Sequence, residues 1–347
     1  MNTLSVCLIA KNEESVIRRV LECASTFADE IIVVDTGSTD NTKNIALEFT
    51  KNVYDYEWND DFSAARNYSF SKATMDYIMW LDCDDIINPA NQEKIKELKL
   101  NGFTANTITA NYRRSPTTVL NVIRIVKRDT AKWYGFIHEY LDTHGQRCNS
   151  DIEIVHAKPD KYLLRDTGRN LRIFEKKKSE HVPFTVRDIL YYAKELYWNN
   201  RYDEAIVEID NYFACQSRWV EDDIQISIIK ASCFEALHRN DDALSTLASA
   251  IVSYGMNPRL VYNAAMLCYN MKKYNQAIMY YQAIISNICK PSVYFADSYD
   301  FMFHSLIWLS CAYWNLGRKE IGKQFHEKAK ELQPNNEIVL NNNKFFD

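Results

Sequence analysis

The stretch "EIIVVDTGSTDNT", residues 30–42, sets an apolar run directly before a polar turn. Its uninterrupted apolar residues are typical of a strand that is buried on both faces of a parallel sheet. The turn residues Asp, Thr, Gly and Ser follow, and "TDNTKNIALEFT" (39–50) then continues with helical character. A buried strand that leads into a helix is the repeating unit of an α/β fold.

The same unit occurs on both sides of this stretch. "LSVCLIA" (4–10) precedes a helix-like segment, and "YIMWLDCDD" (77–85) is an apolar strand that ends in three acids. This alternation predicts an α/β domain with a mainly parallel sheet. Ligands bind beyond the carboxyl ends of the strands in such sheets. We therefore expect the polar residues at 10–13, 35–40 and 82–85 to share one crevice.

The sequence changes character after about residue 170, where strand patterns give way to helical ones. Four segments align on a small residue, a turn and a second small residue; they are residues 193–205, 231–243, 264–277 and 310–322. Small residues let paired helices pack closely, and a period of ~34 residues is typical of a tetratricopeptide array. One face of such an array is concave and suits a peptide or a protein. The alternative is a generic helical bundle.

The composition excludes several classes of protein. The 347-residue chain has a formal net charge of −5, without the basic excess that a nucleic-acid-binding surface requires. Its nine cysteines are scattered without a C-x-x-C pair, which favours reduced thiols over a secreted disulfide framework. No apolar run approaches the ~20 residues of a membrane span, and the N-terminus does not resemble a signal peptide. We expect a cytoplasmic protein of about two domains.

Four motifs occur in the order found in a known family. They are "LSVCLIAKNEE", "EIIVVDTGSTDNT", "FSAARN" and "MWLDCDD". In this order they resemble the family 2 glycosyltransferases, whose catalytic domain has the GT-A fold. The subgroup that the chain resembles carries tetratricopeptide repeats behind the catalytic domain and includes bacterial peptide glycosyltransferases that modify bacteriocins. The resemblance implies a GT-A domain over residues 1–168 and an all-α repeat domain over residues 169–347.

The resemblance also implies a donor site for a UDP-sugar at the ends of the first strands. Asp35, which ends an apolar strand, is placed to accept a hydrogen bond from a uracil N–H. Glu13, after the first strand, is placed to contact the ribose or the base. Ala10 and Cys83 are assigned to this donor site as well.

Arg66, within "FSAARN", has two open roles. Its guanidinium group offers a rigid fork of donors that could bind a diphosphate. An ion pair with a nearby acid such as Asp60 or Asp61 is equally open.

The sequence Asp82-Cys83-Asp84 matches the D-x-D pattern of GT-A enzymes. Alternation along an extended segment points Asp82 and Asp84 to one side and Cys83 to the other. Asp85 is then a bystander that points away. By the resemblance, Asp84 ligates a divalent cation, and Asp82 reaches the ribose or a metal-bound water. Carboxylate and phosphate oxygens favour Mg²⁺ or Mn²⁺ as the cofactor.

Two histidines and one glutamate extend this predicted site. His156 resembles the late histidine that completes the metal site in some GT-A enzymes, with a structural role as the alternative. "WYGFIHEYL" (133–141) brings His138 and Glu139 together. An inverting transferase needs a base that takes the proton of the acceptor. The resemblance implies an acid in this region, so Glu139 is the expected base and His138 its competitor, although the more usual Glu-Asp pair is replaced here.

Together these features predict an enzyme that transfers a hexose or N-acetylhexosamine from a UDP-sugar, with a metal ion and with inversion. The favoured acceptor is a Ser, Thr or Cys side chain of a bacteriocin-type peptide. The repeats would recruit that peptide or hold two copies of the chain together as a homodimer. Two alternatives stay open: assembly of a cell-surface glycan or lipooligosaccharide, and a repeat scaffold that binds nucleotide-sugar without turnover.

Overall fold

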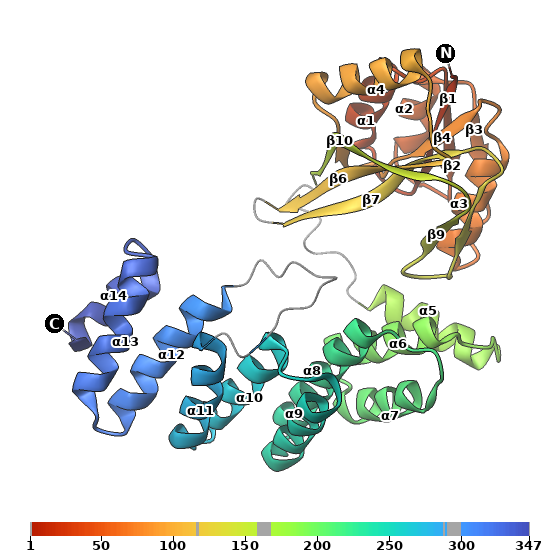
Figure 1. Cartoon of the computed structure of the whole chain (residues 1–347). Helices are drawn as coiled ribbons and strands as arrows, with labels where there is room; N and C mark the ends of the chain where they lie inside the picture. Colours follow the sequence, from red (N-terminus) through yellow and green to blue (C-terminus); the bar gives the residue numbers. More distant parts are fainter. Residues whose placement is uncertain (1, 116–117, 158–167, 287–288, 290–299, 347) are drawn as a thin grey trace. The chain divides into compact units, whose positions relative to one another are not determined.

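The structure, a computed structural model, divides into two compact units, residues 1–167 and 168–347 (Figure 1). The predicted domain boundary, between residues 168 and 169, lies one residue from this division. The residues that the structure describes are 2–115, 118–157, 168–286, 289 and 300–346. Within them, no helix combines the length and the apolar character that crossing a membrane requires.

The N-terminal unit holds ten strands and four helices within the described residues. The strands are β1 (Leu4–Ala10), β2 (Glu30–Asp35), β3 (Val53–Asp55), β4 (Tyr77–Trp80), β5 (Asp85–Ile86), β6 (Thr107–Ser115), β7 (Thr118–Lys127), β8 (Ala131–Tyr134), β9 (Tyr140–Thr143) and β10 (Arg147–His156). The helices are α1 (Ile17–Ala24), α2 (Thr42–Phe49), α3 (Phe62–Ser71) and α4 (Pro89–Asn101).

Eight of these strands form one sheet in the order β3-β2-β1-β4-β7-β6-β10-β5, and β8 and β9 form a separate hairpin. Among the described strands of the large sheet, four neighbouring pairs are parallel and three are antiparallel. The predicted α/β fold with a mainly parallel sheet is therefore confirmed. The antiparallel strands β6 and β7 extend the sheet beyond the strand–helix units that the sequence indicates.

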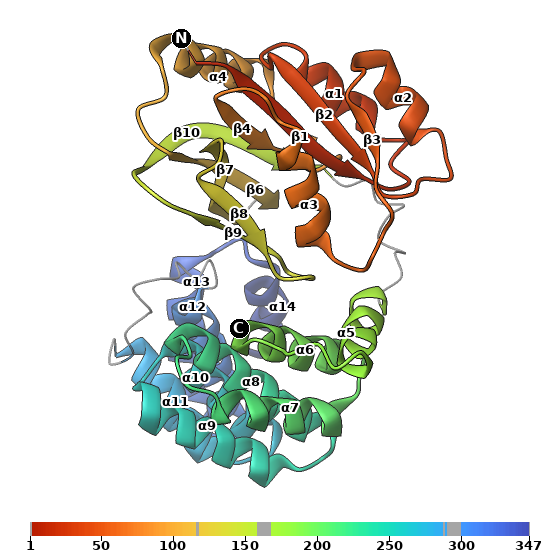
Figure 2. The same cartoon turned by 90° about the vertical axis from the view of Figure 1, so that its right-hand side faces the viewer.

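Alternation along the central strands buries both faces of the sheet. On one face, Leu8 of β1 packs in a cluster with residues of α1, α2 and α4. On the other face, Cys7 and Ile32 pack with α3 and with the β8–β9 hairpin. Figure 2 shows α3 and the hairpin in front of the sheet. The sheet is thus covered on both sides, as a continuous apolar strand requires.

The carboxyl ends of β1, β2 and β4 lie at one edge of the sheet. Ala10, the last residue of β1, is aligned with Asp35, the last residue of β2. The parallel strand β4 ends beside Cys7, where the Leu81 amide donates to the Cys7 carbonyl at 3.2 Å, and the segment that follows reaches Ile9, whose carbonyl lies 3.4 Å from the Cys83 thiol. The loops that the sequence placed in one crevice therefore begin at neighbouring positions.

Within its described residues, the C-terminal unit consists of helices joined by turns and loops and contains no strand. Its helices are α5 (Arg169–Ser179), α6 (Val186–Trp198), α7 (Tyr202–Ala214), α8 (Val220–Ala236), α9 (Asn240–Tyr254), α10 (Pro258–Asn270), α11 (Tyr274–Ile285), α12 (Phe301–Asn315), α13 (Lys319–Leu332) and α14 (Glu337–Phe346). The four predicted repeats coincide with the pairs α6–α7, α8–α9, α10–α11 and α12–α13. The predicted repeat architecture is confirmed.

The small residues of the repeats lie where paired helices approach each other. Ala205, Ala243 and Ala277 are completely buried. At the fourth equivalent position, a Cβ atom added to Gly322 would lie 2.8 Å from the Ser310 carbonyl oxygen. No side chain fits this contact without displacing the backbone of α12, which explains why the last repeat carries glycine.

Candidate functional site

The loops after β1 and β2 are joined by hydrogen bonds between their side chains and backbones. The Asn12 amide donates to Ser38 Oγ at 3.0 Å, and the Thr39 amide donates to Asn12 Oδ1 at 2.8 Å. The Glu13 amide donates to Thr42 Oγ1 at 2.7 Å. These bonds fix the backbone of Glu13 at the rim of the sheet. Ser38 serves as an internal support of this rim.

Asp35 is buried at the end of β2, with 4% of its surface exposed. Its Oδ2 atom accepts hydrogen bonds from the amides of Gly37 at 3.3 Å and Ser38 at 3.0 Å. Its Oδ1 atom is buried and has no hydrogen-bond partner within the described residues. An unsatisfied buried acceptor is costly, so this atom is suited to a ligand that supplies an N–H or O–H donor. The neighbouring Ala10 carbonyl accepts from the Thr36 amide at 2.9 Å.

The acid-rich segment 82–85 forms a tight turn, in which the Asp85 amide donates to the Asp82 carbonyl at 3.1 Å. The extended backbone expected from the sequence is therefore wrong for this segment. Exposure nevertheless alternates, with Asp82 and Asp84 partly exposed and Cys83 buried. The Cys83 thiol lies 3.4 Å from the Ile9 carbonyl, and burial raises its pKa. Cys83 thus anchors the turn against β1.

Asp85 is not the bystander that the sequence suggested. Its carboxylate is almost completely buried, pairs with Arg124 of β7 at 2.9 Å and accepts from the Asp82 amide at 3.0 Å. Burial raises the pKa of Asp85 to about 6, against the opposing effect of Arg124. Its Oδ1 atom has no hydrogen-bond partner within the described residues. Asp85 therefore holds the turn from its buried side and keeps one oxygen available.

Arg124 explains how the turn tolerates carboxylates that lie close together. Its guanidinium group is 1% exposed and lies between the rings of Trp80, at 3.8 Å, and Tyr112, at 4.3 Å. From this position it neutralises Asp85, and it lowers the pKa of Asp82 as well. A buried cation next to buried carboxylates offsets their mutual repulsion. No motif in the sequence indicates Arg124, because it lies on an antiparallel strand outside the strand–helix units.

Arg66 of α3 joins two candidate site residues. Its Nη2 atom donates to Asp82 Oδ1 at 2.9 Å, and its Nε atom donates to Glu139 Oε1 at 2.7 Å. Of the two open roles, the ion pair with an acid is present, but the partners are Asp82 and Glu139 and not Asp60 or Asp61. The group lies 4.9 Å from the ring of Trp80 and 4.9 Å from that of Trp133, which restricts its movement.

Charge is balanced across this bridge. Burial by itself would lower the pKa of Arg66, but Asp82 and Glu139 raise it, so the guanidinium group stays charged. Burial would raise the pKa of Asp82, but Arg66 and then Arg124 lower it below its usual value. The carboxylate of Asp82 is therefore ionised at neutral pH and oriented by Arg66.

Glu139 and His138 lie in the turn between β8 and β9. This hairpin is attached to α3 by Asn67, whose side chain accepts from the Trp133 amide and donates to the Trp133 carbonyl, both at 2.9 Å. The two neighbours differ in placement. Glu139 bonds Arg66, whereas His138 has a left-handed backbone with φ of 52°. Through Arg66, Glu139 is linked to Asp82 of the acid-rich turn.

His156, the last residue of β10, comes close to the acid-rich turn because β10 pairs with β5. Its Nδ1 atom lies 3.4 Å from Asp84 Oδ1, and the hydrogen bond to Asp84 raises the pKa of His156. Ligand atoms of Asp84, Asp85 and His156 all lie within 4.8 Å of one another. Two carboxylates, one with a buried unsatisfied oxygen, and an imidazole form a donor set that suits a divalent cation.

Comparison with known proteins gives separate results for the two units. Residues 5–155 match the model of the family described as Glycosyl transferase family 2. Residues 258–287 and 303–336 match the model described as Tetratricopeptide repeat.

Three relatives cover different parts of the chain. The SPbeta prophage-derived glycosyltransferase SunS of Bacillus subtilis is 26% identical over 228 residues, 60% of this chain and 54% of that protein. A TPR repeat-containing protein of Synechococcus elongatus is 42% identical over 85 residues, 24% of this chain and 21% of that protein. A poly-beta-1,6-N-acetyl-D-glucosamine synthase of Staphylococcus epidermidis is 30% identical over 133 residues, 36% of this chain and 32% of that protein. The chain thus spans about half, or less, of the length of these relatives.

Proposed function

Because the chain carries a glycosyl transferase family 2 domain followed by tetratricopeptide repeats, we propose that it transfers a sugar from a UDP-sugar to a peptide side chain. The observation that carries this proposal is the bridge from Asp82 through Arg66 to Glu139. It links the acid-rich turn, where a donor diphosphate would lie, to a carboxylate that can act on an acceptor. A pocket that only bound nucleotide-sugar would not need this second carboxylate.

The donor base and ribose would lie at the ends of β1 and β2. Asp35 Oδ1, buried and unsatisfied within the described residues, would accept a hydrogen bond from the uracil N–H. Glu13, fixed at the rim, would contact the ribose or the base. Ala10 and Cys83 would shape the floor of this pocket, because Cys83 packs against the last residues of β1.

A divalent cation, Mg²⁺ or Mn²⁺, would be held by Asp84 and His156, with Asp85 Oδ1 as a further donor. When bound, such an ion neutralises charge on the leaving diphosphate as a Lewis acid. The protein itself prepares this charge balance. Asp82 is already occupied by Arg66, so it is better placed to orient the ribose than to act as the main ligand.

The acceptor side would depend on Glu139. Its carboxylate would take the proton of a Ser or Thr hydroxyl or a Cys thiol while the oxygen or sulfur attacks the anomeric carbon. This attack would come from the face of the anomeric carbon opposite the diphosphate. The bond between that carbon and the diphosphate would break, UDP would leave, and the configuration would be inverted. Arg66 keeps one oxygen of Glu139 occupied, and the other oxygen would then take the proton of the acceptor.

The helical unit would recruit the peptide acceptor or join two copies of the chain. The similarity to a glycosyltransferase of Bacillus subtilis over 60% of the chain, which is more than either unit alone, supports a shared architecture. A second candidate acceptor is a growing glycan, which the similarity to the Staphylococcus epidermidis synthase favours. That relative matches over 36% of the chain only, so a peptide remains our first choice.

The test is incubation of the full chain with UDP- and GDP-sugars and with Mg²⁺ or Mn²⁺, followed by measurement of the released nucleotide. We expect UDP to be released from one UDP-hexose or UDP-N-acetylhexosamine and little release from GDP-sugars. Peptides with Ser, Thr or Cys, compared with peptides in which Ala replaces these residues, then distinguish transfer from hydrolysis. Absence of release from every donor would leave only the scaffold alternative.

A further inference from the structure

The β8–β9 hairpin has a strand edge with which no further strand of the described chain pairs. β9 pairs with β8 alone, and the two strands form a sheet that is separate from the large one. The other edge of β8 faces α3, where Asn67 accepts from the Trp133 amide and donates to the Trp133 carbonyl. The hairpin thus has one edge that is bonded to α3 and one open edge, along β9.

The register of the hairpin shows which backbone groups lie on this open edge. Facing residues of an antiparallel pair alternate between those that exchange hydrogen bonds and those that do not. Trp133 directs its amide and carbonyl to Asn67 and is aligned with Leu141, so these two do not exchange bonds. The amides and carbonyls of Leu141 and Thr143 therefore point away from β8, and they have no hydrogen-bond partner within the described residues. Such a row can pair with another extended chain.

The open edge begins beside the proposed base. Glu139 directly precedes β9, and its side chain meets Arg66 on the buried side of the hairpin. Leu141, two residues later, packs on this buried side as well. Tyr140 and Asp142 alternate with them and are exposed. A strand added beside β9 would alternate in the same way, because the side chains of directly opposed residues share one face of a sheet.

We propose that the acceptor peptide binds as an added antiparallel strand along β9, with the residue to be modified level with Glu139. This inference rests on the proposed transfer to a peptide and specifies the conformation of that peptide. The peptide residue opposite Leu141 would exchange backbone hydrogen bonds with it. The modified residue follows two positions later, on the face that carries Glu139. A glycan lacks the alternating amides and carbonyls that this edge can pair with.

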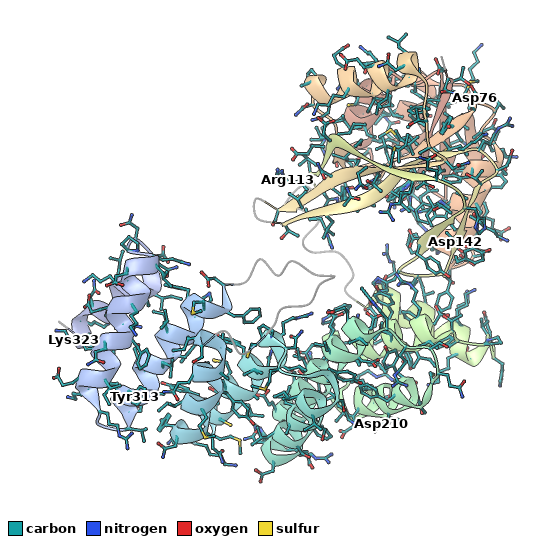
Figure 3. The ribbon with its side chains drawn as sticks, viewed as in Figure 1. Asp76, Arg113, Asp142, Asp210, Tyr313 and Lys323 are labelled. Atoms are coloured by element: carbon teal, nitrogen blue, oxygen red, sulfur yellow. The ribbon has the colours of Figure 1, made fainter. Side chains whose placement is uncertain are left out.

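The exposed side chains of β9 predict part of the peptide sequence. Tyr140 stacks on Tyr134, with ring centroids 5.9 Å apart, and an aromatic residue directly before the modified one would lie opposite Tyr140. Asp142, labelled in Figure 3, forms no ion pair within the described residues. Its cross-strand neighbour Lys132 places its ammonium group 5.4 Å from the centre of the Tyr134 ring. A Lys or Arg three positions before the modified residue would lie opposite Asp142.

The test measures fluorescence anisotropy of labelled peptides with the full chain and without nucleotide-sugar. The probe is Gly-Lys-Val-Tyr-Ser-Gly, in which Lys would lie opposite Asp142, Val opposite Leu141 and Ser level with Glu139. Single N-methyl groups are then placed on its backbone. Methylation at Val removes a hydrogen bond to β9 and should weaken binding about fivefold or more. Methylation at Lys or Tyr, whose amides point away from β9, should change binding by less than about twofold. Equal effects at the three positions, or no binding of the probe, would overturn the proposal.

A charge exchange tests the contact with Asp142. Asp142→Lys should weaken binding of the probe and strengthen binding of a second probe in which Glu replaces Lys. Asp151→Lys is the matched control, because Asp151 is an exposed acid of β10 that pairs with Lys94. This control should leave the order of the two probes unchanged. An unchanged order in Asp142→Lys as well would contradict binding along β9. An unaltered circular dichroism spectrum confirms that each variant is folded.

The outcomes of this test are separable from those of the proposed function, which UDP release measures. UDP release together with uniform effects of N-methylation would retain the proposed function and overturn the strand addition. A second copy of the chain could also occupy the edge. A dimer that Thr143→Pro converts to a monomer in sedimentation experiments would overturn the proposal, because this variant removes an amide of the open edge.

Discussion

Arg66 and Glu139 are joined by a hydrogen bond of 2.7 Å from Nε to Oε1, although 73 residues separate them in the sequence. The same guanidinium group donates to Asp82 at 2.9 Å. One rigid cation thus sets the relative position of the proposed base and of the acid-rich turn. Two Trp rings hold this cation in place. Catalysis by this site would depend on the planar fork of Arg66 and not on its charge alone.

The first prediction follows from this geometry. Arg66→Lys keeps the charge but cannot bond both carboxylates from one plane. We expect kcat for sugar transfer to fall about 100-fold, which is the effect of misplacing a catalytic group by roughly 1 Å. Arg18→Lys is the control, because Arg18 forms an exposed ion pair with Glu48 and its variant should stay within about twofold of the unaltered chain. Equal kcat values for Arg66→Lys and the unaltered chain would show that the bridge does not orient the site.

The second prediction separates the two candidate bases. Glu139→Gln preserves the hydrogen bond from Arg66 but removes the proton acceptor, so transfer should fall by about 100-fold or more. Binding of the UDP-sugar, measured by calorimetry, should persist. His138→Gln should lower transfer by less than about tenfold. The reverse ranking of the two variants would assign the base to His138.

The third prediction concerns the buried pair of Arg124 and Asp85. Arg124→Met leaves an uncompensated buried carboxylate and should lower the free energy of unfolding by about 3–5 kcal/mol in urea titrations. Adding Asp85→Asn to this variant removes the stranded charge and should restore a large part of the loss. If the double variant is no more stable than Arg124→Met, packing between Trp80 and Tyr112 and not charge explains the effect.

The fourth prediction is a pH dependence that belongs to Lys194. Its folded pKa of about 8 lies below the ordinary value of 10.5, so the unfolded chain binds this proton more tightly. Below about pH 8 both states hold the proton, and the buried charge lowers stability in full. Between pH 8 and 10.5 the folded state releases it first, so stability rises with pH relative to a chain without this group.

The comparison that isolates this effect uses Lys194→Met. At pH 7 the variant should unfold at a higher denaturant concentration than the unaltered chain, and the difference should shrink as the pH is raised toward 10. Lys230→Met corrects for the titration of other groups, since Lys230 is paired with Asp210. A stability difference that stays constant with pH would contradict the lowered pKa of Lys194.

The sequence was sufficient for the elements whose signal is local. Continuous apolar runs in β1, β2 and β4 predicted buried strands, and the polar residues after them begin at neighbouring positions of one sheet edge. The helical repeats were visible because tight helix packing restricts certain positions to small residues, as the contact of Gly322 with Ser310 illustrates. Both signals lie within one element or one repeat.

The sequence was insufficient where side chains from distant strands meet. Arg124 lies on β7, and nothing near it in the sequence indicates that it would neutralise Asp85. The pairing of Arg66 with Glu139 depends on the hairpin that Asn67 attaches to α3. Alternation alone predicted Asp85 to be a bystander that points away, which is wrong because its partner Arg124 comes from a distant strand.

The measurement that tests the central claim most directly is UDP release from a UDP-sugar with Mn²⁺, compared between the unaltered chain and Asp84→Asn. Asp84 lies 3.4 Å from His156 at the proposed cation site, and its amide variant removes one charge with little change in volume. We predict release by the unaltered chain, a loss of about 100-fold or more in Asp84→Asn, and no such loss in Asp151→Asn, a control at an exposed acid paired with Lys94. Equal release by Asp84→Asn and the unaltered chain, or no release from any UDP-sugar, would contradict the proposed function.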